Sequence, residues 1–254
     1  MMAGISTNRR CESSASCLFE NGIQFVFRYH SRTTTQPEKR LHPKEAAELA
    51  RAGVSIAAVY QDRARQAGDF GAQRGVEDAI SALHYAGQVG QPADSAVYFA
   101  VDTDFSATEI NAVVVPYFLS IERIFSEAGN GTPYLRIGVY GSGLTCRLVG
   151  GMPFVTYRWL AESTGWRESK TYQAWTVKQS RNAGQALCNL ASAFETCEAK
   201  EVFGDFKPVG FQVQEGQGTV RRVVSGGGNL RHMPSTKFND AITLLPGGHL
   251  GLLV

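Results

Sequence analysis

The sequence predicts an α/β fold, a (β/α)8 TIM-like barrel with an irregular C-terminal tail. Strand-like and helix-like runs alternate from the N-terminus to about residue 180, which favours a mainly parallel sheet. Eight strand-like runs can be counted, the number in a closed (β/α) barrel. Several of them are apolar on both faces, as expected for buried parallel strands. We place the strands at 3–6, 24–30, 54–61, 96–102, 135–140, 157–161, 172–177 and 210–213.

Local signals mark the helix boundaries. Pro43 is tolerated in a first helical turn and Gly53 can adopt the left-handed conformation that ends a helix, so we expect a helix between them. Ser106 and Glu109 have the spacing of a capping box, which predicts that a helix begins directly after the fourth strand. Pro116 lies inside that helix and is expected to kink it. Further helices are expected within 76–89 and 181–206.

One domain is expected over residues 1–216, followed by a C-terminal appendage at 217–254. The chain has 254 residues, of which 43% are hydrophobic and 19% charged, and this is enough to bury a core. The formal charge is +2 and the 25 Lys and Arg residues are scattered, which argues against a nucleic-acid partner. From residue 217 onward the periodic pattern fades, and a Ser-Gly-Gly-Gly run at 225–228 is typical of a flexible connector.

The sequence also bears on location. No apolar run approaches the roughly 20 residues that span a bilayer, so no membrane span is expected. The first ten residues lack the ordered basic, apolar and small-residue regions of a secretory signal peptide. We therefore expect a protein made in the cytoplasm, which needs a non-classical export route if it acts in the periplasm or cell wall.

The five cysteines include no CxxC pair and no histidine at zinc spacing, so neither a metal site nor a cofactor is expected from them. They favour buried free thiols. A bridge between Cys188 and Cys197 is the alternative if the protein reaches an oxidising compartment.

Two aspartates follow the fourth strand-like run. Asp102 and Asp104 come directly after an apolar stretch at 96–101. Because side chains alternate along a strand and each residue rises about 3.3 Å, we expect both carboxylates on one face, on the order of 6–7 Å apart. Catalytic groups often lie at the carboxyl ends of parallel strands. The pair is therefore predicted to act together on one bond.

Polar and aromatic residues end the other predicted strands at the same rim. Sugar rings bind flat aromatic faces, and glycosidic cleavage needs a proton donor and a second carboxylate. An arginine within an apolar strand needs an acidic partner, which for Arg28 we expect to be Glu162 or an aspartate. The residues expected to bind substrate are Arg28, Tyr29, Tyr60, Gln61, Tyr140, Trp159 and Gln179, and those expected to catalyse are Asp102, Asp104 and Glu162.

Simpler interpretations stand beside this one. An aspartate at a strand end before a helix is often a turn or cap residue. The Asp-x-Asp pattern also suits a divalent cation, because magnesium and manganese prefer oxygen ligands. Tyr60, Tyr140 and Trp159 are equally consistent with core aromatics.

Five segments occur in an order that carries a resemblance. They are FRYHS at 27–31, LHPKEA at 41–46, AGVSIAAVYQ at 52–61, VYFAVDTD at 97–104 and IGVYGSG at 137–143. Together they resemble the bacterial glycoside-hydrolase-like domain that is distantly related to the barrel lysozymes of glycoside hydrolase family 25. The match runs over about residues 3–180.

The resemblance implies a (β/α) barrel with its site at the carboxyl ends of the strands and a bacterial cell-wall glycan as substrate. In the related lysozymes the fourth strand ends in Asp-x-Glu with the glutamate as acid, and here that position is Asp104. Such barrels usually end the first strand with an aspartate, whereas this chain has Ser6 there. Glu162 is the residue expected to substitute for the missing carboxylate.

These observations lead to a peptidoglycan-directed glycoside hydrolase of the lysozyme or muramidase type. Asp104 is expected to be the general acid, and Asp102 to stabilise developing positive charge or orient water. The alternatives are a non-catalytic glycan-binding module, motivated by Ser6, and a metal-dependent hydrolase that uses Asp-x-Asp. Delivery as a toxin against neighbouring bacteria would add export machinery and an immunity protein as partners.

Overall fold

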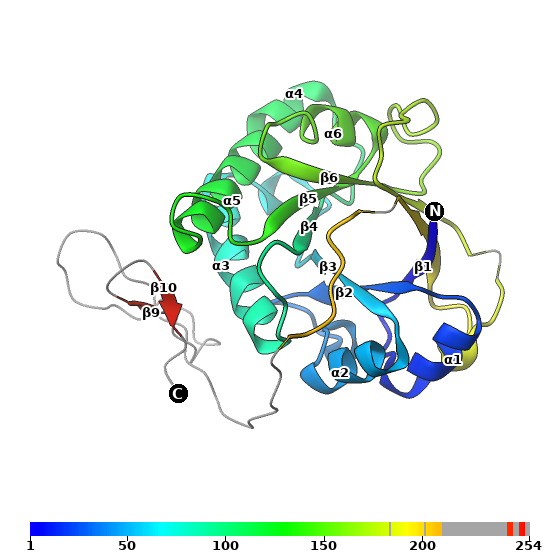
Figure 1. Ribbon diagram of the computed structural model, residues 1–254. Coiled ribbons are helices and arrows are strands. Elements are labelled where there is room, and N and C mark those ends of the chain that lie inside the picture. Colours follow the sequence, from blue (N-terminus) through cyan, green and yellow to red (C-terminus); the bar gives the residue numbers. More distant parts are fainter. Residues whose placement is uncertain (183, 201, 210–242, 246–248, 252–254) are drawn as a thin grey trace.

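The computed structural model describes residues 1–182, 184–200, 202–209, 243–245 and 249–251. Eight strands form a closed barrel in the order β1 to β8, with helices outside it (Figure 1). The strands are β1 (Met2–Ser6), β2 (Phe25–His30), β3 (Ser55–Tyr60), β4 (Ala96–Ala100), β5 (Arg136–Gly141), β6 (Val155–Leu160), β7 (Val177–Ser180) and β8 (Glu195–Ala199). Strands β1 to β7 are parallel, whereas β8 runs antiparallel to both β7 and β1. The predicted eight-stranded α/β barrel is confirmed, with its last strand reversed.

The helices begin and end where local chemistry requires. The α-helices are α1 (Ala15–Glu20), α2 (Pro43–Ala52), α3 (Ala72–Gln88), α4 (Ala107–Glu109), α5 (Val115–Ala128) and α6 (Gly143–Leu148). The 3-10 helices are η1 (Glu12–Ser14), η2 (Pro37–Lys39), η3 (Ala67–Asp69) and η5 (Cys188–Leu190). Helix α2 starts at Pro43 and is ended by Gly53 with φ +94°, as predicted. Helix α3 starts at residue 72, four residues before the expected 76.

The helix after β4 changes its winding before Pro116. Ser106 and Glu109 form the predicted capping box. A π-helical turn, η4 (Ile110–Val114), follows α4, and α5 then begins at Val115. Residues 107–128 are helical without a break, since Val114 and Val115 both keep right-handed helical dihedral angles. Pro116 has no N–H to donate to the preceding turn, and the π-helical turn directly before it is the irregularity that accompanies the proline.

Two predicted elements near the end of the barrel are wrong. The run at 172–177 is not a strand, and the seventh strand is β7. The helix expected within 181–206 is replaced by η5 and β8. Pairing with β1 and β7 on both edges stabilises β8, and this tertiary context outweighs the local pattern.

Two other expectations concern residues beyond the barrel. The strand expected at 210–213 lies outside the described residues. The appendage expected at 217–254 is described only in an antiparallel pair of short strands, β9 (Thr243–Leu245) and β10 (His249–Gly251).

Large aromatic side chains fill the barrel. The rings of Phe27 and Trp159 stack with centroids 3.8 Å apart, and Tyr98 contacts both edge-on. Gly4 leaves room for this core, because a Cβ there would lie 2.5 Å from the ring of Phe25. The interior is thus packed rather than hollow, as in other α/β barrels.

A segment after β8 closes the amino-terminal end of the barrel. Phe203 is fully buried, and its carbonyl accepts a hydrogen bond from the Tyr98 hydroxyl at 2.6 Å. The carbonyl of Gly204 accepts from the first residue of β4, and Phe206 pairs antiparallel with Ile56 of β3. Figure 1 shows this segment in orange across the barrel.

The cysteine interpretation needs one correction. Cys17 on α1 and Cys188 on η5 form a disulfide across 171 residues. The alternative bridge from Cys188 to Cys197 is therefore wrong, because Cys188 is engaged elsewhere. Cys11, Cys146 and Cys197 are free and buried, in agreement with the expectation for most of the thiols.

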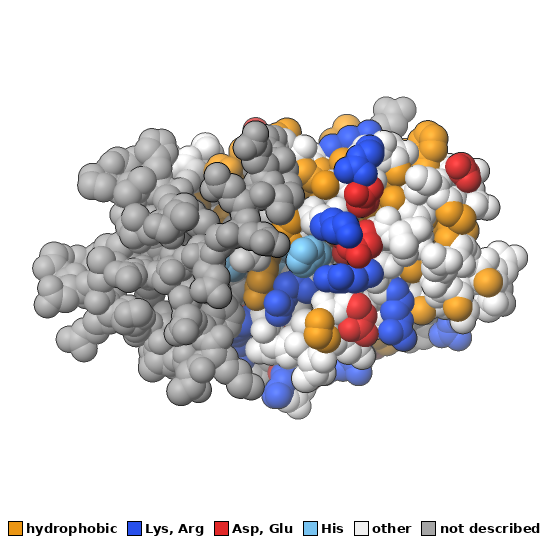
Figure 2. All heavy atoms as spheres, turned by 90° about the horizontal axis from the view of Figure 1, so that it is seen from below, with side chains coloured by type: hydrophobic (Ala, Val, Ile, Leu, Met, Phe, Trp, Pro, Cys, Tyr) orange, Lys and Arg blue, Asp and Glu red, His pale blue; other side chains and the backbone are white. Residues whose placement is uncertain are grey.

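Charges of both signs are mixed on the face shown in Figure 2, where Lys and Arg side chains alternate with Asp and Glu. None of the helices in the described ranges combines the length and apolar composition that a membrane crossing needs.

Candidate functional site

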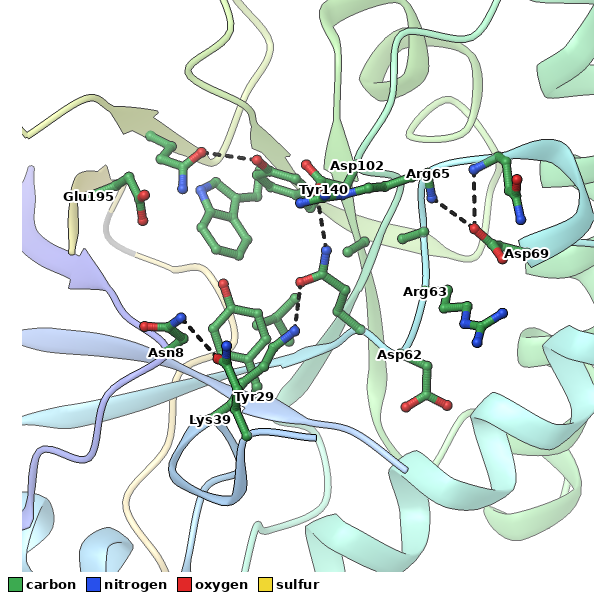
Figure 3. Close-up of a pocket in the computed structure, with 18 residues that line it drawn as sticks. Asn8, Tyr29, Lys39, Asp62, Arg63, Arg65, Asp69, Asp102, Tyr140 and Glu195 are labelled. Carbon is green, nitrogen blue, oxygen red and sulfur yellow. Dashed lines mark hydrogen bonds and ion pairs between the residues drawn. The ribbon is translucent and has the colours of Figure 1, made fainter. Parts of the chain in front are cut away.

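A pocket of about 820 Å³ opens at the carboxyl ends of the parallel strands, opposite the closed end. Three cationic and four acidic side chains line it together with aromatic and amide groups (Figure 3). The lining residues are Asn8, Tyr29, Gln36, Lys39, Val59, Gln61, Asp62, Arg63, Ala64, Arg65, Gln66, Asp69, Ala100, Asp102, Tyr140, Trp159, Gln179 and Glu195.

Asp102 is held at this rim by the loop that follows β3. Its backbone N–H donates to the carbonyl of Ala64 at 2.8 Å. Its carboxylate accepts from Gln61 Nε2 at 3.3 Å and pairs with Arg65 Nε at 3.2 Å. The Gln61 amide oxygen in turn accepts from Lys39 Nζ at 3.2 Å. Asp102 is therefore oriented by an amide and a cation while its side chain stays 23% exposed.

Glu195 brings a second carboxylate that the sequence analysis missed. It is the first residue of β8 and pairs in register with Ser6, the last residue of β1. Ser6 Oγ donates to Glu195 Oε2 at 3.1 Å and accepts from Gln179 Nε2 at 3.1 Å. The Tyr140 hydroxyl donates to the other end of the Gln179 amide, also at 3.1 Å. A chain of three hydrogen bonds thus links Tyr140 to Glu195 and orients the Gln179 amide and the Ser6 hydroxyl between them.

The environment of Glu195 favours its protonated form. Desolvation by surrounding atoms raises the pKa of Glu195, although part of the side chain is exposed to the pocket. The hydrogen bond from Ser6 lowers this pKa, and the negative charges of Asp102 and Glu162 raise it. Burial raises the pKa of Tyr29, and the charges of Glu195 and Asp102 raise it further. The pocket therefore contains two carboxyl groups, Glu195 and Asp102, that lie in different environments and both influence Tyr29.

Asp104 and Glu162 have other surroundings. The carboxylate of Asp104 pairs with the Arg167 guanidinium at 2.7 Å and accepts from the Arg167 backbone N–H at 2.9 Å. These contacts tie the segment after β4 to the segment after β6, and Asp104 is not among the lining residues. Glu162 does not line the pocket either, but its charge acts on Glu195.

Arg28 has a different acidic partner from the one predicted. It is fully buried, and its guanidinium forms an ion pair with Glu45 of α2 at 2.6 Å. The remaining donors bind the carbonyls of Thr7, Glu38 and Lys39 at 2.7–3.0 Å. The partner is thus neither Glu162 nor an aspartate, because Arg28 points out of the barrel toward α2. From there it fixes the backbone of Lys39, which lines the pocket.

The structure brings most of the predicted sugar-binding residues together. Tyr29, Gln61, Tyr140, Trp159 and Gln179 all line the pocket, whereas Arg28 and Tyr60 do not. The Tyr60 hydroxyl donates to Asp62 at 2.9 Å beside the pocket wall. Trp159 Nε1 is buried without a hydrogen-bond acceptor among the described residues.

The described residues contain no group of three or more histidine, cysteine, aspartate or glutamate side chains that could hold a metal ion. Asp102 and Asp104 instead pair with two different arginines.

A closed α/β barrel with acidic residues at the carboxyl ends of its strands agrees with the architecture expected of a glycoside-hydrolase-like domain. The chain belongs to the family described as Rv2525c-like, glycoside hydrolase-like domain, which matches residues 16–204. This confirms the resemblance inferred from the sequence.

Two curated relatives from Bacillus subtilis (strain 168) share part of this sequence. The uncharacterized protein YbfG is 32% identical over 165 residues, which cover 62% of this chain and 22% of YbfG. The uncharacterized protein FadG is 27% identical over 154 residues, which cover 59% of this chain and 26% of FadG. The chain therefore spans about a quarter of the length of these relatives.

Solved structures share the fold. Rv2525c, a Tat-secreted protein of Mycobacterium tuberculosis crystallised with L-tartrate, has a TM-score of 0.68 and 21% identity, over 80% of this chain and 98% of that one. A family 25 glycosyl hydrolase from Bacillus anthracis has a TM-score of 0.53 and 10% identity, over 80% and 94%. A muramidase from Trichobolus zukalii has a TM-score of 0.50 and 12% identity, over 80% and 95%.

Proposed function

We propose that this protein is a glycoside hydrolase that acts on bacterial cell-wall peptidoglycan, with Glu195 and Asp102 as its pair of carboxyl groups. One observation carries the proposal: both line the pocket at the carboxyl ends of the strands, and Glu195 stands beside Ser6, where the related lysozymes have an aspartate. Fold similarity to a family 25 glycosyl hydrolase and a muramidase supports the substrate class.

The two groups have complementary roles in this proposal. Glu195, whose pKa is raised, donates a proton to the oxygen of the leaving sugar. Asp102, paired with Arg65, either stabilises positive charge at the anomeric carbon or orients the attacking water. Tyr29 and Tyr140 offer aromatic faces and hydroxyls to the sugar rings.

The test compares matched carboxamide variants on purified peptidoglycan. We expect the wild type to release reducing ends, and Glu195→Gln and Asp102→Asn each to lower the rate by a factor of about 10²–10⁴. Glu198→Gln, on the same strand but outside the pocket lining, is the control and should retain the wild-type rate. The proposal is wrong if the wild type releases no reducing ends or if Glu195→Gln is as active as Glu198→Gln.

The same assay examines the roles predicted for Asp104 and Glu162. If Asp104 is the general acid, Asp104→Asn abolishes turnover. If its ion pair with Arg167 is a tie between two segments, Asp104→Asn lowers thermal stability and leaves turnover within about tenfold of wild type. Glu162→Gln should shift the pH profile of turnover to lower pH, because the charge of Glu162 raises the pKa of Glu195.

A non-catalytic glycan-binding module is the second candidate. Ser6 and the engagement of Asp104 by Arg167 favour it, since neither position supplies a free carboxylate to the pocket. It predicts saturable binding to cell-wall fragments, with an affinity that Glu195→Gln leaves unchanged and without release of reducing ends.

Action outside the cytoplasm is part of the proposal. The disulfide between Cys17 and Cys188 is typical of proteins in oxidising compartments, and the structural relative Rv2525c is Tat-secreted. Delivery as a toxin, with an immunity protein as partner, stays a prediction from the sequence.

A further inference from the structure

Lys39 is a partly buried cation at the pocket wall without a carboxylate partner. Its Nζ donates to Gln61 Oε1 at 3.2 Å and lies 4.4 Å from the centroid of the Tyr29 ring. No described carboxylate lies within ion-pair distance of it. Its backbone is fixed, since the carbonyl of Lys39 accepts from the buried Arg28 guanidinium at 3.0 Å. One ammonium proton therefore remains available to a ligand.

Arg65 is a second cation with unused donors at the same place. Its loop is fixed by Asp69, whose carboxylate accepts from the backbone N–H groups of Arg65 and Gln66 at 3.1 Å. Only Nε of the guanidinium is engaged, on Asp102 at 3.2 Å, and the side chain is 82% exposed. Both terminal Nη groups have no partner among the described residues.

The two cations are close enough to repel each other. Burial lowers the pKa of Lys39, the charges of Asp102 and Asp62 raise it, and the charge of Arg65 lowers it further. Asp62 pairs with Arg32 at 3.4 Å, and Arg32 also contacts Glu77 and Asp78. Within the cluster that Gln61 and Asp102 join, two cations, Lys39 and Arg65, share one carboxylate, so a monoanion bound by their free donors would balance the charge of this cluster.

We propose that Lys39 and Arg65 form a subsite for the carboxylate of an acidic saccharide, next to the acidic pair. This inference rests on the proposed function for its choice of a saccharide ligand. A carboxylate carries the single negative charge that Lys39, Arg65 and Asp102 leave to be balanced, whereas a phosphate dianion would place a second negative charge beside Asp102. Bidentate binding of a carboxylate by the free edge of a guanidinium is also the geometry that arginine favours.

The experiment compares ligands that differ only in one charge. The first pair is the disaccharide of N-acetylglucosamine and N-acetylmuramic acid with a free carboxylate, and the methyl amide of the same disaccharide. The second pair is a disaccharide that contains glucuronic acid, and its counterpart with glucose. Binding is measured by isothermal titration calorimetry with the 254-residue chain carrying Glu195→Gln, a substitution that prevents turnover, and at low salt, which limits screening.

We expect the acid of at least one pair to bind about tenfold more tightly than its neutral partner, the value of one good charge-assisted hydrogen bond. The pair that shows the preference identifies a carboxylate on a lactyl group or on the ring. Lys39→Gln and Arg65→Gln should each bring the ratio close to one, and Lys39→Arg should preserve it. The exposed residues Lys44 and Arg123 lie outside the pocket, so Lys44→Gln and Arg123→Gln should keep the wild-type ratio.

Equal binding of acid and neutral partner in both pairs, absence of binding by either acid, or a preference that survives in Lys39→Gln and Arg65→Gln would each overturn the subsite. The proposed function is measured separately, by release of reducing ends. A wild type that releases reducing ends from peptidoglycan, in a protein that binds both members of each pair equally, refutes the subsite alone. A wild type that releases no reducing ends from peptidoglycan, in a protein that prefers the acid, refutes the hydrolase alone.

Discussion

Replacing the buried arginine of β2 should cost more stability than any surface charge of this protein. Arg28→Met leaves the carboxylate of Glu45 buried, with only Cys11 beside it as a donor, through its backbone N–H at 2.8 Å and its thiol, in the part of the chain that the structure describes. It also removes the donors that satisfy the carbonyls of Thr7 and Lys39. Losing one partner of a buried ion pair costs about 3–5 kcal/mol.

The assay is urea unfolding followed by circular dichroism, supported by thermal melts. At about 2–4 °C per kcal/mol for a chain of this size, Tm should fall by roughly 6–20 °C. Arg51→Met is the matched control, because Arg51 pairs with Glu48 on the surface of the same helix α2 as Glu45, and an exposed pair contributes about 0–1 kcal/mol.

A double variant separates the charge from the packing. In Arg28→Met/Glu45→Leu no uncompensated carboxylate remains, so part of the lost stability should return. A single variant that loses less than about 1 kcal/mol would refute the reasoning. So would a double variant as unstable as the sum of the two single ones.

Three further predictions concern the site and its support. Ser6→Ala removes a hydrogen bond that lowers the pKa of Glu195, so the alkaline limb of the pH profile of kcat/KM for peptidoglycan should move to higher pH; a move to lower pH would contradict the acid role. Burial raises the pKa of Asp78 from 3.8 to about 7, so the folded protein binds a proton that the unfolded chain releases, and stability should fall by up to about 4 kcal/mol as pH rises from 4 to 8. Asp78→Asn should flatten this dependence in urea unfolding, and an unchanged slope would argue against it. Cys17→Ser should lower the free energy of unfolding by about 2–5 kcal/mol, and a reductant should destabilise the wild type but not the variant.

The first six strands could be predicted because each is a short run rich in β-branched, apolar or aromatic residues between turn signals, and β2, β3 and β4 are buried on both faces. The structure places the six strands in chain order around the barrel. The pocket residues at their carboxyl ends followed from the same pattern, since parallel strands share one rim. Tyr29, Gln61, Asp102 and Tyr140 were found in this way.

Glu195 was missed because the other pocket residues were found at the carboxyl ends of parallel strands, and Glu195 does not lie at such an end. Strand β8 is antiparallel, so its first residue, rather than its last, stands at the rim. Its segment is short, and Glu195, which lies on the same face of the strand as the buried Cys197 and Ala199, interrupts the apolar pattern of that face. The signal available in the sequence was Ser6, because a missing acid at one strand end directs attention to the neighbouring strands.

Arg28 was noticed in the sequence, but its acidic partner was predicted wrongly. Its need for an acidic partner follows from the sequence, but the choice among carboxylates depends on which face of the strand it occupies. Phe27 points into the barrel, so Arg28 points toward α2, where Glu45 lies in the first helical turn. Because neighbouring side chains of a strand point to opposite faces, placing Arg28 on the wrong face was enough to assign it to the substrate pocket.

The segment that closes the amino-terminal end of the barrel also decides how the protein can be handled. The backbone N–H of Val209 donates to the carbonyl of Gly90 at 3.1 Å, so the chain leaves the barrel at the end opposite the pocket. A resin or a sensor surface coupled near Val209 would hold the molecule with its pocket facing the solution. Insoluble, sheet-like substrates could then approach an immobilised molecule without obstruction by its own support.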